Sequence, residues 1–198
     1  SISSYYPEGT IISSSISKCF GAGGWRLGFI AVPKNLRDFL SRMKAVGSET
    51  FSSVSSPIQY AAIEAYTGDY TDYIFKTRNI LNSVGRYVYN NLKSNNILIN
   101  PPQGGFYLMP EFINSKFKSS IDLCDSILNE TGVALLPGSA FGFDKTKMLT
   151  RLSYTDFDGD EFLKNTSSYE LPGNDIIEKY APNVVEGTNK LSEWSKNL

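Results

Sequence analysis

The sequence of 198 residues contains no histidine. This absence excludes Ser-His-Asp and Cys-His catalytic groups and removes the commonest zinc ligand. Proton transfer in any active site of this chain therefore falls to Lys, Asp, Glu, Tyr or a cofactor. The sequence has only two cysteines, too few for a framework of several disulfides. We expect reduced thiols in a cytoplasmic protein, with a mitochondrial location left open.

A charge excess and long apolar runs are also missing. The 19 basic residues nearly balance the 20 acidic ones, so a polyanion such as nucleic acid is not an expected partner. No run of 18 apolar residues indicates a membrane-spanning helix. The chain starts with neither Met nor a basic signal-peptide region, and we expect it to begin within a longer protein. Its 41% hydrophobic residues are sufficient for a packed core.

Two strands are predicted near the start of the chain. The segment from Thr10 to Ser17 is rich in β-branched and small residues and leads into a glycine cluster. The apolar run from Gly28 to Val32 is closed by Pro33 and predicts a second, buried strand. The two strands bracket a flexible, glycine-rich loop.

Helical spacing follows. Apolar residues from Leu36 to Val46 recur at helical intervals, and Gly47 is expected to end that helix. Ser56 and Pro57 predict the start of another helix with a capping box. A longer stripe runs from Ile74 to Leu92 and indicates a helix that connects two lobes.

The long helix suggests a division of the chain near Gly85. We therefore predict one domain over residues 1–85 and a second over residues 86–198. The second domain alternates short strands and helices, among them a helix over residues 121–131 ended by Gly132 and an amphipathic helix from Pro182. The pattern as a whole indicates an α/β or α+β architecture.

The most specific stretch is Ser-Ile-Ser-Lys at residues 15–18, followed by Gly-Trp-Arg-Leu-Gly at residues 24–28. It places two hydroxyls, an amine and a guanidinium between two apolar strands, in a loop whose glycines allow a ligand to approach the backbone. This segment resembles the lysine segment of fold-type I pyridoxal-phosphate enzymes of the aspartate aminotransferase family, class I and II. Their pattern is Ser-x-Ser-Lys followed by Gly-x-Arg-x-Gly.

The resemblance implies roles for four residues. Lys18 would form the Schiff base with pyridoxal phosphate and would also act as the general base. Ser15, Ser17 and Arg26 would bind the cofactor phosphate, which suits a planar fork of donors together with hydroxyls.

Three later segments fit the same family. Residues 102–107, Pro-Gln-Gly-Gly-Phe-Tyr, are similar to its Pro-x-Gly-Gly-x-Phe/Tyr stretch, and residues 133–142 are similar to its Val-x-x-x-Pro-Gly-x-x-Phe-Gly loop. We interpret both as architectural. Arg151 lies in Arg-Leu-Ser-Tyr, where the family has Arg-x-Ser/Ala-Tyr/Phe, and would bind the substrate α-carboxylate with a bidentate pair.

The resemblance spans about Thr10 to Tyr154 and corresponds to the C-terminal half of a family member. It implies an α/β fold class: part of the large-domain sheet, a long interdomain helix and an α+β small domain. The family's residues that contact the cofactor ring precede its lysine, and none can be assigned here. We therefore expect the isolated chain to be inactive.

The predicted function is pyridoxal-phosphate-dependent transfer of an amino group from an amino acid to a 2-oxo acid, in a homodimer and without a metal. A lyase or synthase of the same fold shares the lysine segment and stays an alternative. A non-catalytic module that binds the cofactor or dimerises is a second one, although retention of Lys18, Arg26 and Arg151 together argues against it. The side-chain specificity cannot be predicted from these motifs.

Overall fold

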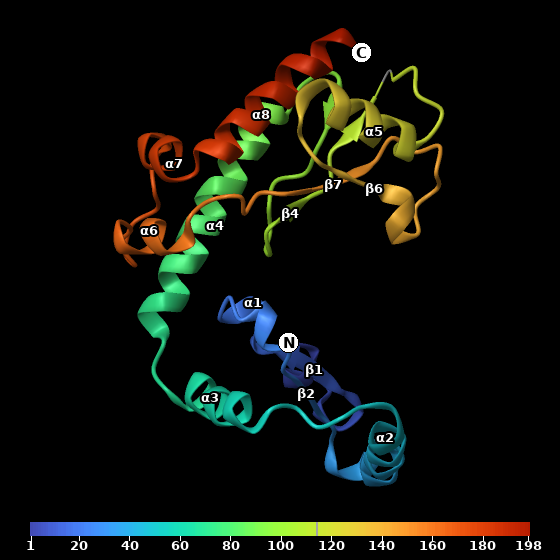
Figure 1. The fold of residues 1–198 in the computed structure, drawn as a ribbon, viewed down its shortest axis with the longest axis vertical. Coiled ribbons are helices and arrows are strands. Elements are labelled where there is room, and N and C mark those ends of the chain that lie inside the picture. The colour runs from blue at the N-terminus through green and yellow to red at the C-terminus, as the bar shows by residue number, and fades with distance from the viewer. Residues whose placement is uncertain (114) are drawn as a thin grey trace. The chain divides into compact units, whose positions relative to one another are not determined.

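The computed structural model describes residues 1–113 and 115–198. They form two compact units, Ser1–Tyr70 and Thr71–Leu198, which are built of helices and short strands as the α/β class predicts (Figure 1). All the strand pairs in the described part of the chain are antiparallel.

The first unit contains a two-stranded ribbon and three α-helices. Its elements are β1 (Ile12–Ser15), α1 (Ile16–Cys19), β2 (Gly28–Ala31), α2 (Arg37–Thr50) and α3 (Ser56–Thr67), with short 3-10 turns between some of them, including η3 (Gly23–Trp25) and η4 (Lys34–Leu36). β1 pairs with β2, with Ser15 opposite Gly28. The strand predicted from Thr10 to Ser17 is thus shorter than expected, because the chain turns into α1 at Ile16.

Two helix predictions in this unit were wrong in detail. α2 continues past Gly47 to Thr50, since one glycine costs a helix interior only about 1 kcal/mol. α3 begins at Ser56 with Pro57 in its first turn, but the expected capping box is not formed. Instead the Gln59 side-chain amide donates to the carbonyl of Val54 at 2.8 Å.

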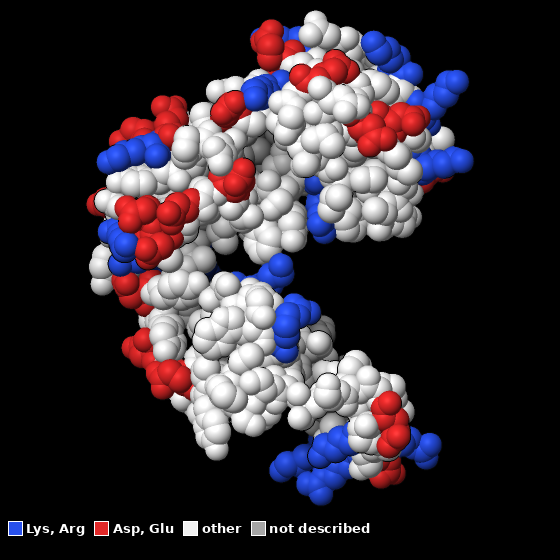
Figure 2. Space-filling view, viewed as in Figure 1, with Lys and Arg blue, Asp and Glu red and all other residues white. Residues whose placement is uncertain are grey.

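The first unit has almost no core. Of its apolar residues in the described chain, Ile16 and Ala62 alone are buried, whereas Phe51 is 77% and Tyr60 74% exposed. Figure 2 shows that its visible face over α3 and the β1–β2 ribbon carries few charged side chains. The prediction that residues 28–32 form a buried strand was therefore wrong about burial: β2 is exposed along its length, although the Phe29 ring contacts that of Tyr66 on α3.

The second unit is built on the 22-residue helix α4 (Thr71–Leu92), as its long apolar stripe predicted. α5 (Ser120–Thr131) ends at Gly132, which adopts the left-handed conformation, and α8 (Pro182–Trp194) begins at the predicted proline. Two short helices, α6 (Gly159–Lys164) and α7 (Asn174–Tyr180), were not predicted. α8 packs along α4 (Figure 1).

Two small sheets complete this unit. One pairs β3 (Ile97–Leu98) with β5 (Glu111–Phe112), and the other has the order β4-β7-β6, from Tyr107–Leu108, Thr150–Ser153 and Leu136–Pro137. The sheets and helices enclose one core, whose fully buried side chains include Val84, Leu92, Phe112, Leu123, Ile127, Tyr154, Phe162 and Leu191.

The division of the chain differs from the predicted one. The compact units separate between Tyr70 and Thr71, not at Gly85. The reason is the burial of α4: from Ile80 to Leu92 its inward stripe packs in the core of the second unit, so the whole helix belongs to that unit.

Candidate active site

The lysine segment begins where β1 turns into α1. Ser15 is the N-cap of α1, and its hydroxyl accepts a hydrogen bond from the backbone N–H of Ser17 at 3.3 Å. Ile16 is 2% exposed and anchors this turn in the first unit. Lys18 follows on the last turn of α1 and is exposed to solvent.

Arg26 has an unusual backbone conformation. Its φ of 54° is left-handed, and among residues 1–113 and 115–198 no other non-glycine residue has a positive φ. This conformation costs about 1 kcal/mol in an L-residue, so the local structure must impose it. The Nη1 atom of Arg26 donates to the carbonyl of Gly23 at 3.0 Å, which ties the side chain to its own glycine turn.

Ser15, Ser17 and Arg26 line one open groove of about 720 Å³ in the first unit. The groove lies along β1, β2 and α2, and the residues that line it include hydroxyl groups, Arg26 and Lys44, with no acidic side chain among the described residues. Hydroxyls and cations without an acid are the donors that suit a phosphate dianion. The chemistry of this donor set therefore fits the phosphate of pyridoxal phosphate.

The groove contains three of the four residues predicted for the first unit. Lys18 is a neighbour in sequence but is not among the residues that line the groove. Sequence reasoning missed Lys44, the second cation of the groove. It lies on α2, far along the chain from the motif. The only signal for it in the sequence is the alternation of charged and apolar residues on that helix.

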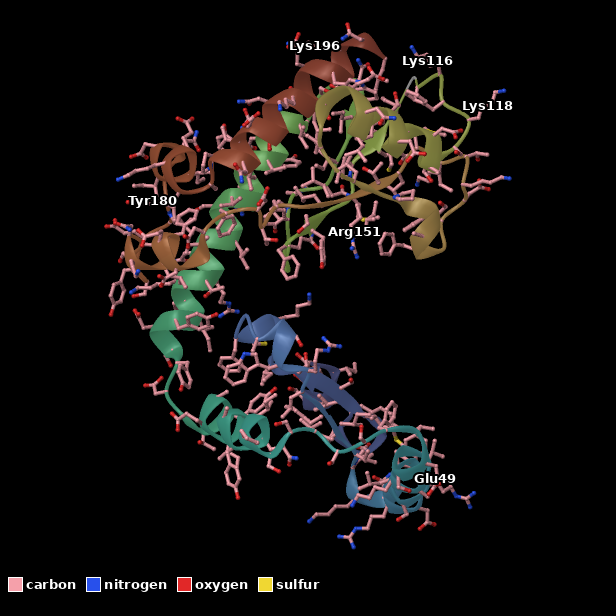
Figure 3. The ribbon with its side chains drawn as sticks, viewed as in Figure 1. Glu49, Lys116, Lys118, Arg151, Tyr180 and Lys196 are labelled. Atoms are coloured by element: carbon pink, nitrogen blue, oxygen red, sulfur yellow. The ribbon has the colours of Figure 1, made fainter. Side chains whose placement is uncertain are left out.

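Arg151 lies on β7 in the second unit. Along this strand Thr150 and Leu152 are buried, so the alternation of a β-strand directs Arg151 to the other face of the sheet. Figure 3 shows the Arg151 side chain leaving the sheet on the side away from α5. No acidic side chain in the described ranges, 1–113 and 115–198, forms an ion pair with it.

Two aromatic rings take the place of an acidic partner. The guanidinium carbon of Arg151 lies 4.4 Å from the ring centroid of Tyr107 and 4.4 Å from that of Phe141. Both rings come from motifs that the sequence analysis interpreted as architectural. That interpretation missed their contact with Arg151, because the three residues are far apart in sequence.

The described residues offer neither a metal site nor a membrane span. Their Cys, Asp and Glu side chains form no group arranged to hold a metal ion. Outside residue 114, no helix has the length and apolar content that crossing a membrane requires.

Comparisons with known proteins place the chain in a family. The sequence model of the family Aminotransferase class I and II matches residues 3–164. A probable N-acetyl-LL-diaminopimelate aminotransferase of Bacillus subtilis is 33% identical over 141 residues, which are 71% of this chain and 35% of that protein. An aspartate aminotransferase of Bacillus sp. strain YM-2 is 33% identical over 150 residues, 73% of this chain and 36% of that protein. The chain thus spans about a third of the length of these curated relatives.

Solved structures agree on the fold. The aspartate aminotransferase of Rhizobium meliloti superposes with a TM-score of 0.71 at 22% identity, over 94% of this chain and 42% of that one. The alanine aminotransferase of Pyrococcus furiosus superposes with a TM-score of 0.68 at 25% identity, over 95% of this chain and 42% of that one. The predicted fold class, part of the pyridoxal-phosphate-dependent transferase fold, is confirmed. The chain belongs to the class I and II aminotransferases.

Proposed function

We propose that the protein transfers an amino group from an amino acid to a 2-oxo acid with pyridoxal phosphate as cofactor. Aminotransferases of class I and II generally depend on this cofactor. The observation that carries the proposal is the groove that Ser15, Ser17 and Arg26 line together, with no acidic side chain in its lining. Because the chain spans only about a third of its relatives, the activity is proposed for the full-length protein.

Lys18 is proposed as the catalytic residue. Pyridoxal phosphate, when bound, supplies an aldehyde for covalent attachment to an amine and a ring that accepts the electrons of the substrate Cα–H bond. The Nζ of Lys18 would hold the cofactor and would move the proton at the substrate Cα. The residue lies on the exposed surface of α1.

Ser15, Ser17 and Arg26 are proposed to bind the cofactor phosphate. Arg26 uses one N–H on Gly23 and retains further N–H donors for an anion. The left-handed backbone of Arg26 supports this role, because strained backbone conformations cluster at ligand-binding and active sites. Arg151 is proposed to bind the substrate α-carboxylate through its paired N–H groups.

The assembly and the domain assignment are also proposals. Family members act on amino acids and 2-oxo acids and are generally dimers, and we propose a homodimer with these substrates. We assign the first unit to the large cofactor-binding domain and the second to the small domain of the family. We further propose a cytoplasmic location, which fractionation of cells tests directly.

The test uses the full-length protein loaded with pyridoxal phosphate. Its absorbance is followed while an amino acid is added, and then while a 2-oxo acid is added. We expect the spectrum of the lysine-linked cofactor to disappear in the first step and to return in the second. A protein that binds no cofactor would refute the enzyme proposal. If the spectrum of the bound cofactor responds to the amino acid but no amino group reaches the 2-oxo acid, the lyase or synthase is favoured. If the spectrum of the bound cofactor does not respond to the amino acid, the non-catalytic module is favoured.

A first prediction concerns the substrate arginine. Arg151→Ala is expected to weaken amino-acid binding about 100-fold, because a charge-assisted bidentate pair is lost, while cofactor binding stays unchanged. The absorbance titration measures both constants. Arg78→Ala, which removes an exposed arginine of the same unit, serves as the control and is expected to change neither. If Arg151→Ala loses cofactor and substrate equally, the assigned role is wrong.

A further inference from the structure

We propose that Tyr107 and Phe141 form an aromatic clamp that holds Arg151 in position for a carboxylate. The clamp is defined as these two rings together with the guanidinium that lies over both of them. The inference rests on the proposed function, because Arg151 is there the group that binds the substrate. It assigns the two rings as positioning residues and gives the two glycine-containing motifs, residues 102–107 and 133–142, a role in substrate recognition.

The contacts of Arg151 carry the inference. Its guanidinium carbon lies at the same distance, 4.4 Å, from both ring centroids, which is well within the range of cation–π attraction. The two rings come from separate segments, Tyr107 from β4 and Phe141 from the 3-10 turn η5 (Gly138–Phe141). An arginine that merely extends into solvent would not be held from two sides.

The backbone that carries each ring is itself fixed. Tyr107 follows Gly105, whose φ of 69° makes the turn into β4, and the Tyr154 hydroxyl donates to the Gly105 carbonyl at 3.0 Å. Phe141 precedes Gly142, whose φ of 85° ends the turn η5. Either glycine would be strained by a side chain.

Both ring-bearing segments are also bound to β7, the strand of Arg151, or to the residue before it. β4 pairs with β7 through Tyr107 opposite Ser153. β6, which leads into η5, pairs with β7 as well, and the N–H of Gly138 donates to the carbonyl of Leu149, just before β7, at 2.7 Å. Tyr154, which is 1% exposed, continues the same strand and anchors the Gly105 turn from inside the core. The clamp is therefore assembled around β7.

The chemistry explains why rings serve better than an acid here. A neighbouring carboxylate would occupy the N–H donors of Arg151 and compete with the substrate. An aromatic ring attracts the cation through its face and accepts no strong hydrogen bond, so it restrains the side chain and leaves the donors for the ligand. A restrained arginine loses less conformational freedom when the carboxylate binds.

The experiment compares ligands that differ only in the carboxylate. The full-length protein loaded with pyridoxal phosphate is titrated with L-alanine and ethylamine, and with L-phenylalanine and 2-phenylethylamine. The variants are Tyr107→Leu and Phe141→Leu. Tyr107→Phe keeps the ring, and Phe143→Leu removes an exposed ring that does not lie on Arg151. Thermal unfolding of each variant checks its fold.

Each leucine variant is expected to weaken amino-acid binding about 3- to 10-fold, the equivalent of one cation–π contact, and to leave amine binding unchanged. Tyr107→Phe and Phe143→Leu are expected to behave like the unmodified protein. In an Arg151→Ala background, the leucine substitutions are expected to have no further effect, since the partner of both rings is gone.

Three results would overturn the clamp. They are an equal loss for amino acids and amines, an unchanged amino-acid affinity, and a loss that persists without Arg151. An unmodified protein whose spectrum responds to neither amino acid would instead refute the proposed function, and the clamp with it. The two failures are thus distinguished by the unmodified protein alone.

Discussion

Lys18→Ala is expected to lower the rate of amino transfer about a thousandfold or more in the full-length protein. The reason is that one amine performs two tasks in the proposed reaction: it holds the cofactor, and it moves the proton at the substrate Cα. Removing a positioned proton-transfer group alone costs about 10²- to 10⁴-fold. Single-turnover absorbance measurements with a 2-oxo acid and an amino acid give the rate.

Two further variants sharpen this prediction. Lys18→Arg keeps the positive charge but cannot lose its proton, so it is expected to be as inactive as Lys18→Ala. Lys34→Ala removes an exposed lysine from the turn η4 of the same unit and is expected to keep full activity. If Lys18→Ala retained a tenth of the activity, Lys18 would not be the catalytic residue.

The second large effect is expected from separating the two units between Tyr70 and Thr71. We expect residues 71–198 to fold alone, because the second unit contains a continuous core of buried apolar side chains. We expect residues 1–70 to remain unfolded alone, because Ile16 and Ala62 are the apolar residues that this unit buries. Burial of so little apolar surface cannot offset the loss of chain entropy.

Circular dichroism and urea titration of the two fragments test this prediction. Residues 71–198 should show one cooperative transition, and Leu92→Ala should lower its unfolding free energy by about 2–5 kcal/mol through the cavity that it leaves. Residues 1–70 should show no transition. Cooperative unfolding of the first fragment would mean that its exposed apolar side chains find partners within the unit.

The helices of the second unit were largely predictable from the sequence. α4 and α8 carry apolar stripes at helical spacing, and α5 ends at a glycine. Both signals are local in the sequence. α6 and α7 are short and lack such a stripe, so they depend on tertiary packing. Phe162 of α6 and Ile177 of α7 are each buried in the core by that packing.

The first unit shows the limit of local patterns. An apolar run such as residues 28–32 indicates a strand that is suited to burial, and β2 forms, but the pattern does not say which residues cover it. The compact units divide at a different place from Gly85 for a related reason. An apolar stripe shows which face of a helix is buried. Which unit buries that face depends on residues that are distant in sequence.

The grouping of residues in the candidate site was predictable where they are close in sequence. The spacing from Ser15 to Arg26 lies within one short segment, and the structure brings Ser15, Ser17 and Arg26 to one groove. The left-handed backbone of Arg26 has no sequence signal, because that conformation is usually found at glycine. Tyr107 and Phe141 were missed as partners of Arg151 since only the pairing of three strands brings them together.

The central claim is that the Lys18 amine holds the cofactor. Its most direct test is to load the full-length protein with pyridoxal phosphate, reduce it with borohydride, digest it and locate the modified lysine by mass spectrometry. We predict one stoichiometric pyridoxyl group, on the peptide that contains Lys18. A modification on another lysine, or none on a protein that has bound the cofactor, would contradict the claim.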